Sequence, residues 1–474
     1  MRKQLHDAFS VMMGKLHQQQ GAVLDIQIMV DPAVTGFIDA HSSVLDSAIQ
    51  QHTMSEGMRR RLTRSNYIFS GMKTFHELNE AFPSLLDENG ERKPFERFLN
   101  DVQKIDSTYN GNYLRAEYNF VQASAEMAAK WESFMEDGDH YNLQYRTQGD
   151  SHVRPEHAEL HGVTLPPSDS FWEEYYPPNG WNCRCTVVQV RKSKYPTTPH
   201  DEAVSRGEAA LQRDTKGMFR FNPGIEKKTV PDYNPYTIKR CKDCDIASKL
   251  ASGALDNELC AACQLVRQCY RNKGEKEERA RVEDNRKLYD RLSKDSRYIN
   301  VEFNPENGAL KATHRGHNMP EEKSNNQGKQ KEQILIEKLF NCGHSVILLD
   351  ESRRNPSYIR GDGKKIQGDI KTAVDMILDG KVMDIYSPEN DKKHFGGAIV
   401  SKNNQMFKYN NRTDIDQTGE TMCIFFSDPE WFSPEKIRMS IEYAKEKSTH
   451  DIVLKDVVCA INTQGRLRLI TFPM

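Results

Sequence analysis

Four cysteines in the middle of the chain have a spacing that favours metal binding. Cys241 and Cys244 form one Cys-x2-Cys pair, and Cys260 and Cys263 form a second pair 15 residues further on. Two such pairs provide four thiolates, which can complete a tetrahedral zinc site and stabilise a segment with little core of its own. Redox-active thiols are the competing interpretation. We predict a structural zinc ion here, with one short helix between the two pairs.

A second group of histidines and cysteines lies nearer the N-terminus. His157 and His161 are four residues apart, and Cys183 and Cys185 flank an arginine. Two His and two Cys could form a tetrahedral zinc site if the intervening loop folds back. The Cys-x-Cys spacing is shorter than the usual one, and buried hydrogen-bonded histidines with core thiols are an equally open interpretation. For a Cys-His nucleophile, the sequence provides no third group to orient the base.

These residues belong to a longer series of motifs. Asp150, Arg154 and His157 form D-x-x-x-R-x-x-H, a Phe-Trp pair follows, and P-P-N-G-W-N-C-R-C ends at Cys185. Together with the Tyr- and Ala-rich helix upstream, these motifs resemble the Mu F-like head-morphogenesis family of tailed phages over about 80 residues. The resemblance implies a minor capsid protein near the portal, acting in virion head assembly with portal and capsid proteins. Asp150 and Arg154 are spaced to form an ion pair.

A second candidate site lies in the C-terminal part. Asp379-Gly380 is a strong two-residue hairpin signal between strands predicted at 374–378 and 381–386. That register places Asp375 opposite Asp384, and like charges directly opposite each other destabilise a sheet. An exposed edge would make the pair harmless. A divalent metal ion or a cationic substrate group would give it a function.

The order of these residues resembles the nuclease domains of contact-dependent toxins. Glu332 lies on a predicted helix, a Gly-His-Ser-Val strand start follows, and the Asp375 and Asp384 strands come next. Such domains occur fused to Mu F-like modules in the polymorphic toxins of temperate phages, which implies a nuclease and a matching immunity protein. These nucleases usually carry a lysine two residues after the second acid, where this chain has Tyr386. Lys381, Lys392 and Lys393 are the substitutes that the sequence offers.

Two histidines extend the catalytic candidates. His314 and His317 lie in a predicted polar loop with Arg and Lys, a combination suited to metal-free acid–base cleavage of RNA or tRNA. The candidate catalytic residues are Asp375, Asp384, Glu332, His314 and His317. The alternative is a purely structural head protein whose C-terminal domain binds portal or DNA without chemistry.

Composition limits the other possibilities. The 474 residues suggest two to four domains, and a net charge of −2 gives no overall attraction to nucleic acid or membrane. The sequence shows no apolar run near the roughly 20 residues that span a bilayer, and no secretory signal is expected at its N-terminus. Ten cysteines then indicate thiols or metal ligands rather than disulfides. We expect the protein in the phage virion or in the cytoplasm of a bacterial host.

The elements that must position these residues suggest a multidomain α+β protein. A helix is predicted over 113–135, whereas 140–190 has little periodicity and is expected to be held by side-chain contacts or metal. Alternating helices and strands follow residue 300. The predicted regions are a helical N-terminal region (1–110), the Mu F-like module (111–192), a connector (193–235), the zinc segment (236–270), a charged helical linker (271–299) and an α+β nuclease-like domain (300–474).

Overall fold

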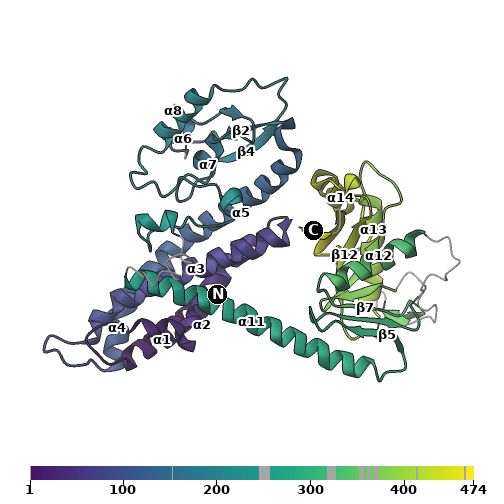
Figure 1. Ribbon diagram of the computed structural model, residues 1–474, viewed down its shortest axis with the longest axis horizontal. Coiled ribbons are helices and arrows are strands. Elements are labelled where there is room, and N and C mark those ends of the chain that lie inside the picture. Colours follow the sequence, from purple (N-terminus) through teal and green to yellow (C-terminus); the bar gives the residue numbers. More distant parts are fainter. Residues whose placement is uncertain are drawn as a thin grey trace. The chain divides into compact units, whose positions relative to one another are not determined.

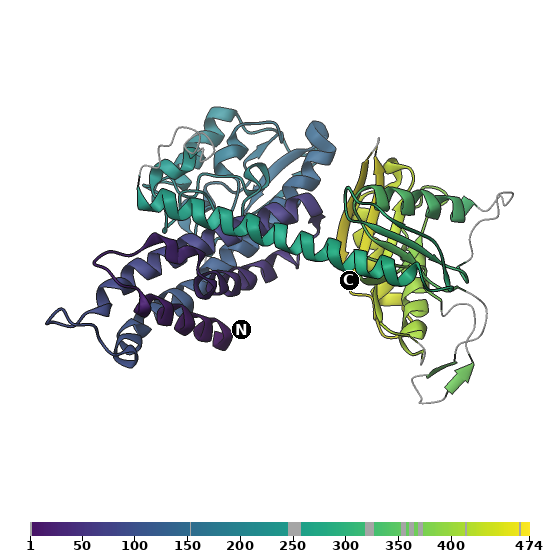
Figure 2. The same cartoon turned by 60° about the horizontal axis from the view of Figure 1, so that its bottom comes forward.

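The computed structural model describes residues 2–151, 153–244, 257–317, 327–351, 357–359, 365–367, 373–412, 415–463 and 466–474. The chain divides into two compact units (Figure 1). Unit 1 contains residues 1–52 and 57–273, and unit 2 contains residues 53–56 and 274–474. The helix α11 (Glu258–Leu292) contributes its first part to unit 1 and its second part to unit 2, and Figure 2 shows it as one continuous helix. The division into six regions stays a prediction.

Unit 1 is mainly helical, with one small sheet. Its longer helices are α1 (Arg2–Gln18), α2 (Pro32–Ile49), α3 (Glu56–Ala81), α4 (Phe95–Asp106), α5 (Leu114–Asp137) and α8 (His200–Ala210). Its shorter elements are β2 (Asn142–Arg146), α6 (Pro155–Ala158), β3 (Thr164–Leu165), α7 (Phe171–Tyr175), β4 (Thr186–Val190) and α9 (Pro223–Glu226). A π-helical segment (Ser107–Tyr113) joins α4 to α5.

Capping residues and glycines explain several of these elements. Asp31 caps α2 by accepting a hydrogen bond from the Ala33 amide, and Pro32 supplies the fixed φ that suits a first helical position. Asn222 caps α9 in the same way. Gly224 follows in α9, where a Cβ would lie 2.2 Å from the Cβ of Trp131, so only glycine allows α9 to pack on α5.

The helical part of unit 1 buries a charged network. The Lys73 ammonium on α3 donates to Glu117 Oε2 on α5 at 2.6 Å and to the Tyr109 carbonyl of the π-helical segment at 2.9 Å. His41 on α2 lies against the same pair. Burying a charge is costly unless it is paired, so these contacts fix the register of the three helices against one another.

The region from α5 to β4 is more regular than its sequence suggests. Because residues 140–190 have little periodicity, side-chain contacts or metal were expected to hold them, yet they contain the antiparallel sheet β3-β2-β4. β2 is buried on both faces and therefore lacks the alternation of polar and apolar residues that marks a half-exposed strand. The predicted helix over 113–135 is confirmed as α5.

Unit 2 is a mixed sheet covered by helices. In chain order its strands are β1 (Met54–Ser55), β5 (Tyr298–Phe303), β6 (Leu310–His314), β7 (Val346–Leu348), β10 (Met376–Leu378), β11 (Lys381–Tyr386), β12 (Gly419–Phe426), β13 (Asp456–Thr463) and β14 (Arg466–Pro473). Its other helices are α12 (Gln327–Asn341), α13 (Gly396–Asn410) and α14 (Pro434–Lys447). The short strands β8 (Ser357–Ile359) and β9 (Lys365–Gln367) form a separate pair.

The centre of this sheet is an antiparallel β7-β10-β11 meander, to which β12 and then β13 add in parallel. The parallel crossovers pass through α13 and α14. Residues of α12 pack on one face, with Leu335 and Leu339 against Met376, and residues of α13 and α14 pack on the other face. Both faces are therefore covered, and the exposed-edge interpretation of the two aspartates is wrong.

The predicted hairpin register is confirmed. Met376 pairs with Met383 and Leu378 with Lys381, through a turn in which Asp379 and Gly380 both have positive φ. This conformation matches the right-handed twist of the strands and explains the Asp-Gly dipeptide.

The polar loop predicted around His314 and His317 begins instead as strand β6. Within the described residues, no helix is both long and apolar enough to cross a membrane.

Candidate functional site

Two loops of unit 1 are joined by the residues of the D-x-x-x-R-x-x-H motif. Arg154 donates from Nη2 to the Trp181 carbonyl at 2.6 Å. Its guanidinium lies over Gly180, where a Cβ would come within 2.7 Å of Nη1. The glycine of the P-P-N-G motif therefore makes room for the arginine of the first motif, and the two motifs form one structure.

Asp150 makes the second connection, with a partner that differs from the expected one. Its two oxygens accept hydrogen bonds of 2.7 and 2.8 Å from both terminal nitrogens of Arg184, in a bidentate pair at the surface. The predicted pairing of Asp150 with Arg154 is wrong, because Gly149 has positive φ and the chain before α6 is not helical, so the four-residue spacing does not bring the two side chains together.

His157 makes the third connection. Its Nδ1 lies 3.7 Å from Cys183 Sγ and 3.8 Å from Cys185 Sγ, and all three residues are buried. Within the described residues, this is the group of three or more His, Cys, Asp or Glu whose ligand atoms all lie within 4.8 Å of one another. His161 is not part of it, because its Nδ1 accepts from Thr147 on an exposed face. The predicted two-His, two-Cys set is therefore a His-Cys-Cys set, which makes it a candidate metal site.

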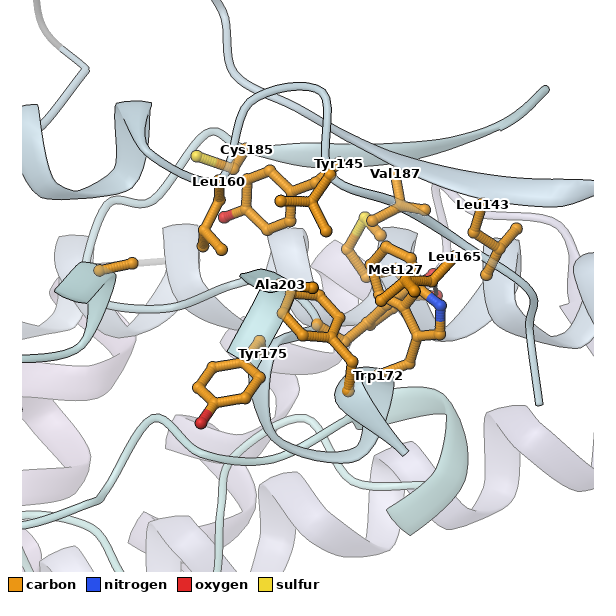
Figure 3. Packing of buried hydrophobic residues seen from close by; sticks show 14 of the residues in the cluster. Met127, Leu143, Tyr145, Leu160, Leu165, Trp172, Tyr175, Cys185, Val187 and Ala203 are labelled. Carbon is orange, nitrogen blue, oxygen red and sulfur yellow. Dashed lines mark hydrogen bonds between the residues drawn. The ribbon is translucent and has the colours of Figure 1, made fainter. Parts of the chain in front are cut away.

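The hydrophobic core beneath positions this group. Tyr145 on β2 is fully buried beside Cys185 (Figure 3), and its hydroxyl donates to Asn179 Oδ1 at 2.8 Å. Trp172 of the Phe-Trp motif donates from Nε1 to the Pro166 carbonyl and lies in the same cluster. The aromatic residues of the motif are thus core residues, and the polar ones join the loops above them.

The four cysteines of the predicted zinc segment line one cavity of unit 1. Cys241 and Cys244 come from the segment after Ile238, and Cys260 and Cys263 lie in the first turns of α11. Arg267 donates to Cys263 Sγ at 3.4 Å, and burial raises the pKa of the Cys263 thiol. The four sulfurs do not form a group with three or more ligand atoms within 4.8 Å of one another, in contrast to the ligand atoms of His157, Cys183 and Cys185. The short helix predicted between the pairs falls mainly on residues 245–256, outside the described residues.

Unit 2 contains a second cluster, built around Asp375 and Asp384. Asp384 on β11 is fully buried, and Asp375 just before β10 accepts a hydrogen bond from the Ile385 amide at 2.6 Å. Lys402 on α13 approaches both, with Nζ 3.0 Å from Asp384 Oδ1 and 4.0 Å from Asp375 Oδ2. Lys402 thus places a cation of the chain itself beside the facing aspartates, and the divalent metal ion or cationic substrate group stays a prediction. The predicted substitute Lys392 instead donates to the Tyr386 hydroxyl.

Burial and charge set the protonation of this pair. Burial raises the pKa of Asp384 far above its usual range, and the charge of Asp375 adds to the effect. For Asp375, burial acts upward too, but the hydrogen bond with Asp384 and the charge of Lys402 bring its pKa below the usual value. The two pKa values are therefore shifted in opposite directions, upward for Asp384 and downward for Asp375. Asp384 Oδ2 is a buried oxygen without a hydrogen-bond partner.

His317 continues the cluster. Its Nε2 lies 2.8 Å from Glu332 Oε1 on α12, and its Nδ1 lies 3.1 Å from the Leu349 carbonyl and 3.4 Å from Glu351 Oε2. Lys329 joins the two glutamates, 2.9 Å from Glu351 and 3.0 Å from Glu332. Because both ring nitrogens are engaged, His317 positions the carboxylates and is not a free base.

Of the five predicted catalytic residues, four come together and one does not. Asp375, Asp384, Glu332 and His317 share the cluster. His314 lies apart, 3.8 Å from Asp350 and with its ring against Tyr298. Sequence reasoning missed Lys402 and Glu351. The buried Met406-Tyr409 face of α13 indicates which way that helix turns, so Lys402 could have been placed on its inner side, whereas Glu351 carries no comparable pattern.

Comparison with known proteins shows which protein family the motif region of unit 1 resembles. Residues 88–188 match the sequence profile of the family described as "Phage Mu protein F like protein", and this range contains the motifs joined at Arg154, Asp150 and His157. The predicted Mu F-like resemblance is confirmed for this region of the chain.

Individual relatives agree with that class. The chain is 36% identical over 107 residues to the "Putative capsid assembly protein F" of Escherichia phage Mu, covering 22% of this chain and 21% of the Mu protein. It is 31% identical over 115 residues to the "Mu-like prophage FluMu F protein" of Haemophilus influenzae, covering 23% of this chain and 28% of that protein. An uncharacterized protein of Methanocaldococcus jannaschii is 45% identical over 47 residues, 10% of this chain and 7% of its own length. No solved structure matches the chain.

Proposed function

We propose that unit 1 acts in assembling a phage head, as a minor capsid protein that contacts portal and capsid proteins. The support is the Mu F-like match over residues 88–188, together with the use of the motif residues to join two loops. The relative from phage Mu carries capsid assembly in its name. The proposed locations are therefore the virion and, before assembly, the cytoplasm of the bacterial host.

Head assembly can be tested in the phage or prophage that encodes the chain. Deletion should reduce the yield of DNA-filled heads in electron micrographs, and the full chain should restore it. The variant Arg154→Lys keeps the charge but loses the planar guanidinium over Gly180 and should restore it poorly. Lys436→Ala, on a surface ion pair of unit 2, is the matched control. Normal head yields after deletion would exclude an assembly role.

We further propose that unit 2 cleaves phosphodiester bonds, with RNA as the first candidate and DNA as the second. The observation that carries this proposal is Lys402 beside Asp375 and Asp384, which supplies the lysine that the sequence lacks at Tyr386. A lysine ammonium at this place can hold the scissile phosphate or stabilise the negative charge that develops on it. The resemblance to toxin nucleases adds an immunity protein as an expected partner.

A divalent cation is the cofactor that the acidic cluster suits. The carboxylates of Glu351, Asp375 and Asp384 are hard oxygen ligands. Such an ion would polarise the phosphate and lower the pKa of a bound water. Within the described residues the three acids do not form a group whose ligand atoms all lie within 4.8 Å of one another, and Lys402 lies against two of them, so these side chains would have to rearrange to hold the ion. The chain's own residues then have two tasks: Lys402 holds the phosphate, and His317 and Lys329 orient the glutamates.

The test uses the full chain with tRNA, total RNA and DNA, each with Mg²⁺, with Zn²⁺ and with chelator. The wild type should cut at least one substrate, and Asp375→Asn and Glu351→Gln should reduce cutting by 100-fold or more (roughly the loss of one charged group in the reaction). Lys436→Ala should leave it unchanged. Intact substrates under all conditions would support the alternative, a non-catalytic C-terminal unit that binds portal or DNA.

We also propose a structural zinc ion at Cys241, Cys244, Cys260 and Cys263. Their spacing and their common cavity support it. The sulfurs would have to draw together on the metal, which would tie the start of α11 to the segment after Ile238. Metal analysis of the full chain tests this site, because a structural zinc ion should be lost in Cys260→Ser/Cys263→Ser.

A further inference from the structure

His157, Cys183 and Cys185 have the separations that a zinc ion requires. Zn–S bonds of about 2.3 Å and Zn–N bonds of about 2.05 Å in a tetrahedron place N and S about 3.6 Å apart. The observed distances from Nδ1 to the two sulfurs are 3.7 and 3.8 Å. The imidazole nitrogen therefore lies at metal-binding separations from both sulfurs, and the three ligand atoms all lie within 4.8 Å of one another.

The backbone explains why the three atoms converge. The Cys183 amide bonds to the Gly180 carbonyl in a turn, and Asn182 has φ of +59°, which swings the Cys-x-Cys segment toward α6. The two loops are held together by the Arg154 and Asp150 contacts, which involve none of the three ligands. These contacts, together with the core on which Cys183 and Cys185 pack, preorganise the group.

Ordinary core thiols and a nucleophilic pair fit the geometry less well. Cys183 and Cys185 belong to the hydrophobic core cluster, but packing alone does not require both sulfurs to face the same imidazole nitrogen, as they do here. A Cys-His nucleophile needs one thiol and a third group that orients the histidine, and here a second thiol takes the place next to the imidazole. Three borderline-soft ligands on one point are the usual coordination of zinc.

The group also opens onto a cavity. A cavity of about 400 Å³ is lined by the three ligands and by Val153, Arg154, Asn182 and Arg184. Within the described residues, no fourth His, Cys, Asp or Glu joins the three. Zinc sites with three protein ligands and access to a cavity keep their fourth position for water or another donor, unlike closed four-cysteine sites.

We propose that His157, Cys183 and Cys185 bind a zinc ion whose fourth position faces this cavity and exchanges its ligand. In the absence of another donor, water occupies that position. The zinc site does not depend on the proposed head-assembly or nuclease functions. The motif that contains His157 and the motif that contains Cys183 and Cys185 would then bind zinc together, in addition to joining two loops.

The first test is metal content of the purified full chain. We expect two zinc ions per chain, one at each site, and a loss of one ion in Cys183→Ser/Cys185→Ser. Cys260→Ser/Cys263→Ser should lose the other ion, so failure of one site is distinguishable from failure of the other. His161→Asn and Cys342→Ser change a neighbouring histidine and an exposed thiol and should keep both ions. Unchanged zinc content in Cys183→Ser/Cys185→Ser would overturn the proposal.

The second test avoids dependence on a variant that unfolds. In the Cys241→Ser/Cys244→Ser/Cys260→Ser/Cys263→Ser background, Co²⁺ should give the visible absorption of a tetrahedral site with thiolate charge-transfer bands. Added imidazole should shift this spectrum, because it enters the exchangeable position. Cys185→His should keep the metal and weaken the charge-transfer bands. A tetrahedral spectrum that imidazole leaves unchanged would show a closed site and overturn the exchangeable fourth position.

Discussion

The two units position their candidate sites by different means. In unit 1, the motif residues lie on loops around β2 and β4, and each is held by a contact to the other loop. In unit 2, Asp384 lies within β11 and Asp375 just before β10, two strands whose register the hairpin turn sets, and a helix contributes the cation. The first arrangement depends on residue identity at many positions, and the second depends mostly on regular backbone structure.

This difference explains which region is recognisable. Loops that close through Arg154 on Gly180 or Asp150 on Arg184 tolerate few alternative residues, and residues 88–188, which contain these loops, match a family. A strand register tolerates many sequences, and a lysine can reach an acidic pair from more than one element. The candidate site of unit 2 is therefore recognised from the positions of its side chains in the structure and not from a sequence motif.

The largest expected loss of stability follows from a substitution in unit 2. Lys402→Met removes the cation from Asp384 and Asp375 and leaves a buried carboxylate pair without its partner. Breaking a buried ion pair costs about 3–5 kcal/mol, so unit 2 should unfold at a much lower urea concentration. The measurement is denaturant unfolding followed by a probe in each unit.

Two further variants sharpen this result. Asp375→Asn in the Lys402→Met background removes the carboxylate whose pKa is lowered, and therefore the remaining charge, and should recover much of the lost stability. Lys73→Met breaks the corresponding buried pair with Glu117 in unit 1 and should destabilise that unit by a similar amount. A small effect of Lys402→Met would mean that the pair is solvated, and the contrast with the loops of unit 1 would weaken.

The next largest effect is a pH dependence of the free energy of unfolding of unit 1. Glu77 on α3 is fully buried, and burial raises its pKa to about 8, against opposing effects of Lys73 and Asn110. The folded chain keeps this proton above pH 4.5 while the unfolded chain releases it, so the stability it provides is lost as pH rises toward 8. Between pH 6.5 and 8 the loss is about 2 kcal/mol, at about 1.4 kcal/mol per pKa unit.

Glu77→Gln isolates this effect. Glutamine cannot titrate, so the variant should unfold with less dependence on pH in this range and should be the more stable form at pH 8. The buried His41, whose pKa burial lowers to about 4, acts in the opposite direction only below pH 6.5. Equal slopes for wild type and variant between pH 6.5 and 8 would show that Glu77 is ionised in the folded chain.

The sequence predicted the regular elements better than the contacts between them. The Asp379-Gly380 turn, the register of Met376 with Met383 and helix α5 followed from local pattern. These features depend on residues close in sequence, where turn chemistry and periodicity carry the information. The Mu F-like motifs could be recognised in the sequence because each is short and they follow one another in a fixed order.

The contacts that the sequence did not predict involve longer separations. Lys402 lies 18 residues after Asp384, on a helix whose approach to the sheet no local pattern gives. Arg184, rather than Arg154, pairs with Asp150 across 34 residues. His161 has the right spacing to join His157, but a glycine at 162 with positive φ ends the turn and leaves His161 beside Thr147. Spacing along the chain is informative only where the backbone between two residues is regular.

A smaller effect tests the loops of unit 1. Gly180→Ala places a Cβ 2.7 Å from Arg154 Nη1, which must shift and lose its hydrogen bond to the Trp181 carbonyl. The guanidinium is flexible, so the expected cost is one hydrogen bond, about 1 kcal/mol. Thermal unfolding measures it. Gly36→Ala, in α2 with open space around its Cβ, should instead stabilise the chain and serves as the control.

The smallest expected effect separates stability from motif function. Asp150→Asn removes one charge from the bidentate pair with Arg184, in which both side chains are more than 40% exposed. Exposed ion pairs contribute about 0.2–1 kcal/mol, so the unfolding midpoint should move little, and less at high salt. A loss of DNA-filled heads despite that small shift would mean that Asp150 and Arg184 act at a surface used in assembly. A shift of several kcal/mol would instead mean that this pair holds the two loops together, in the way that Lys402 holds the acids of unit 2.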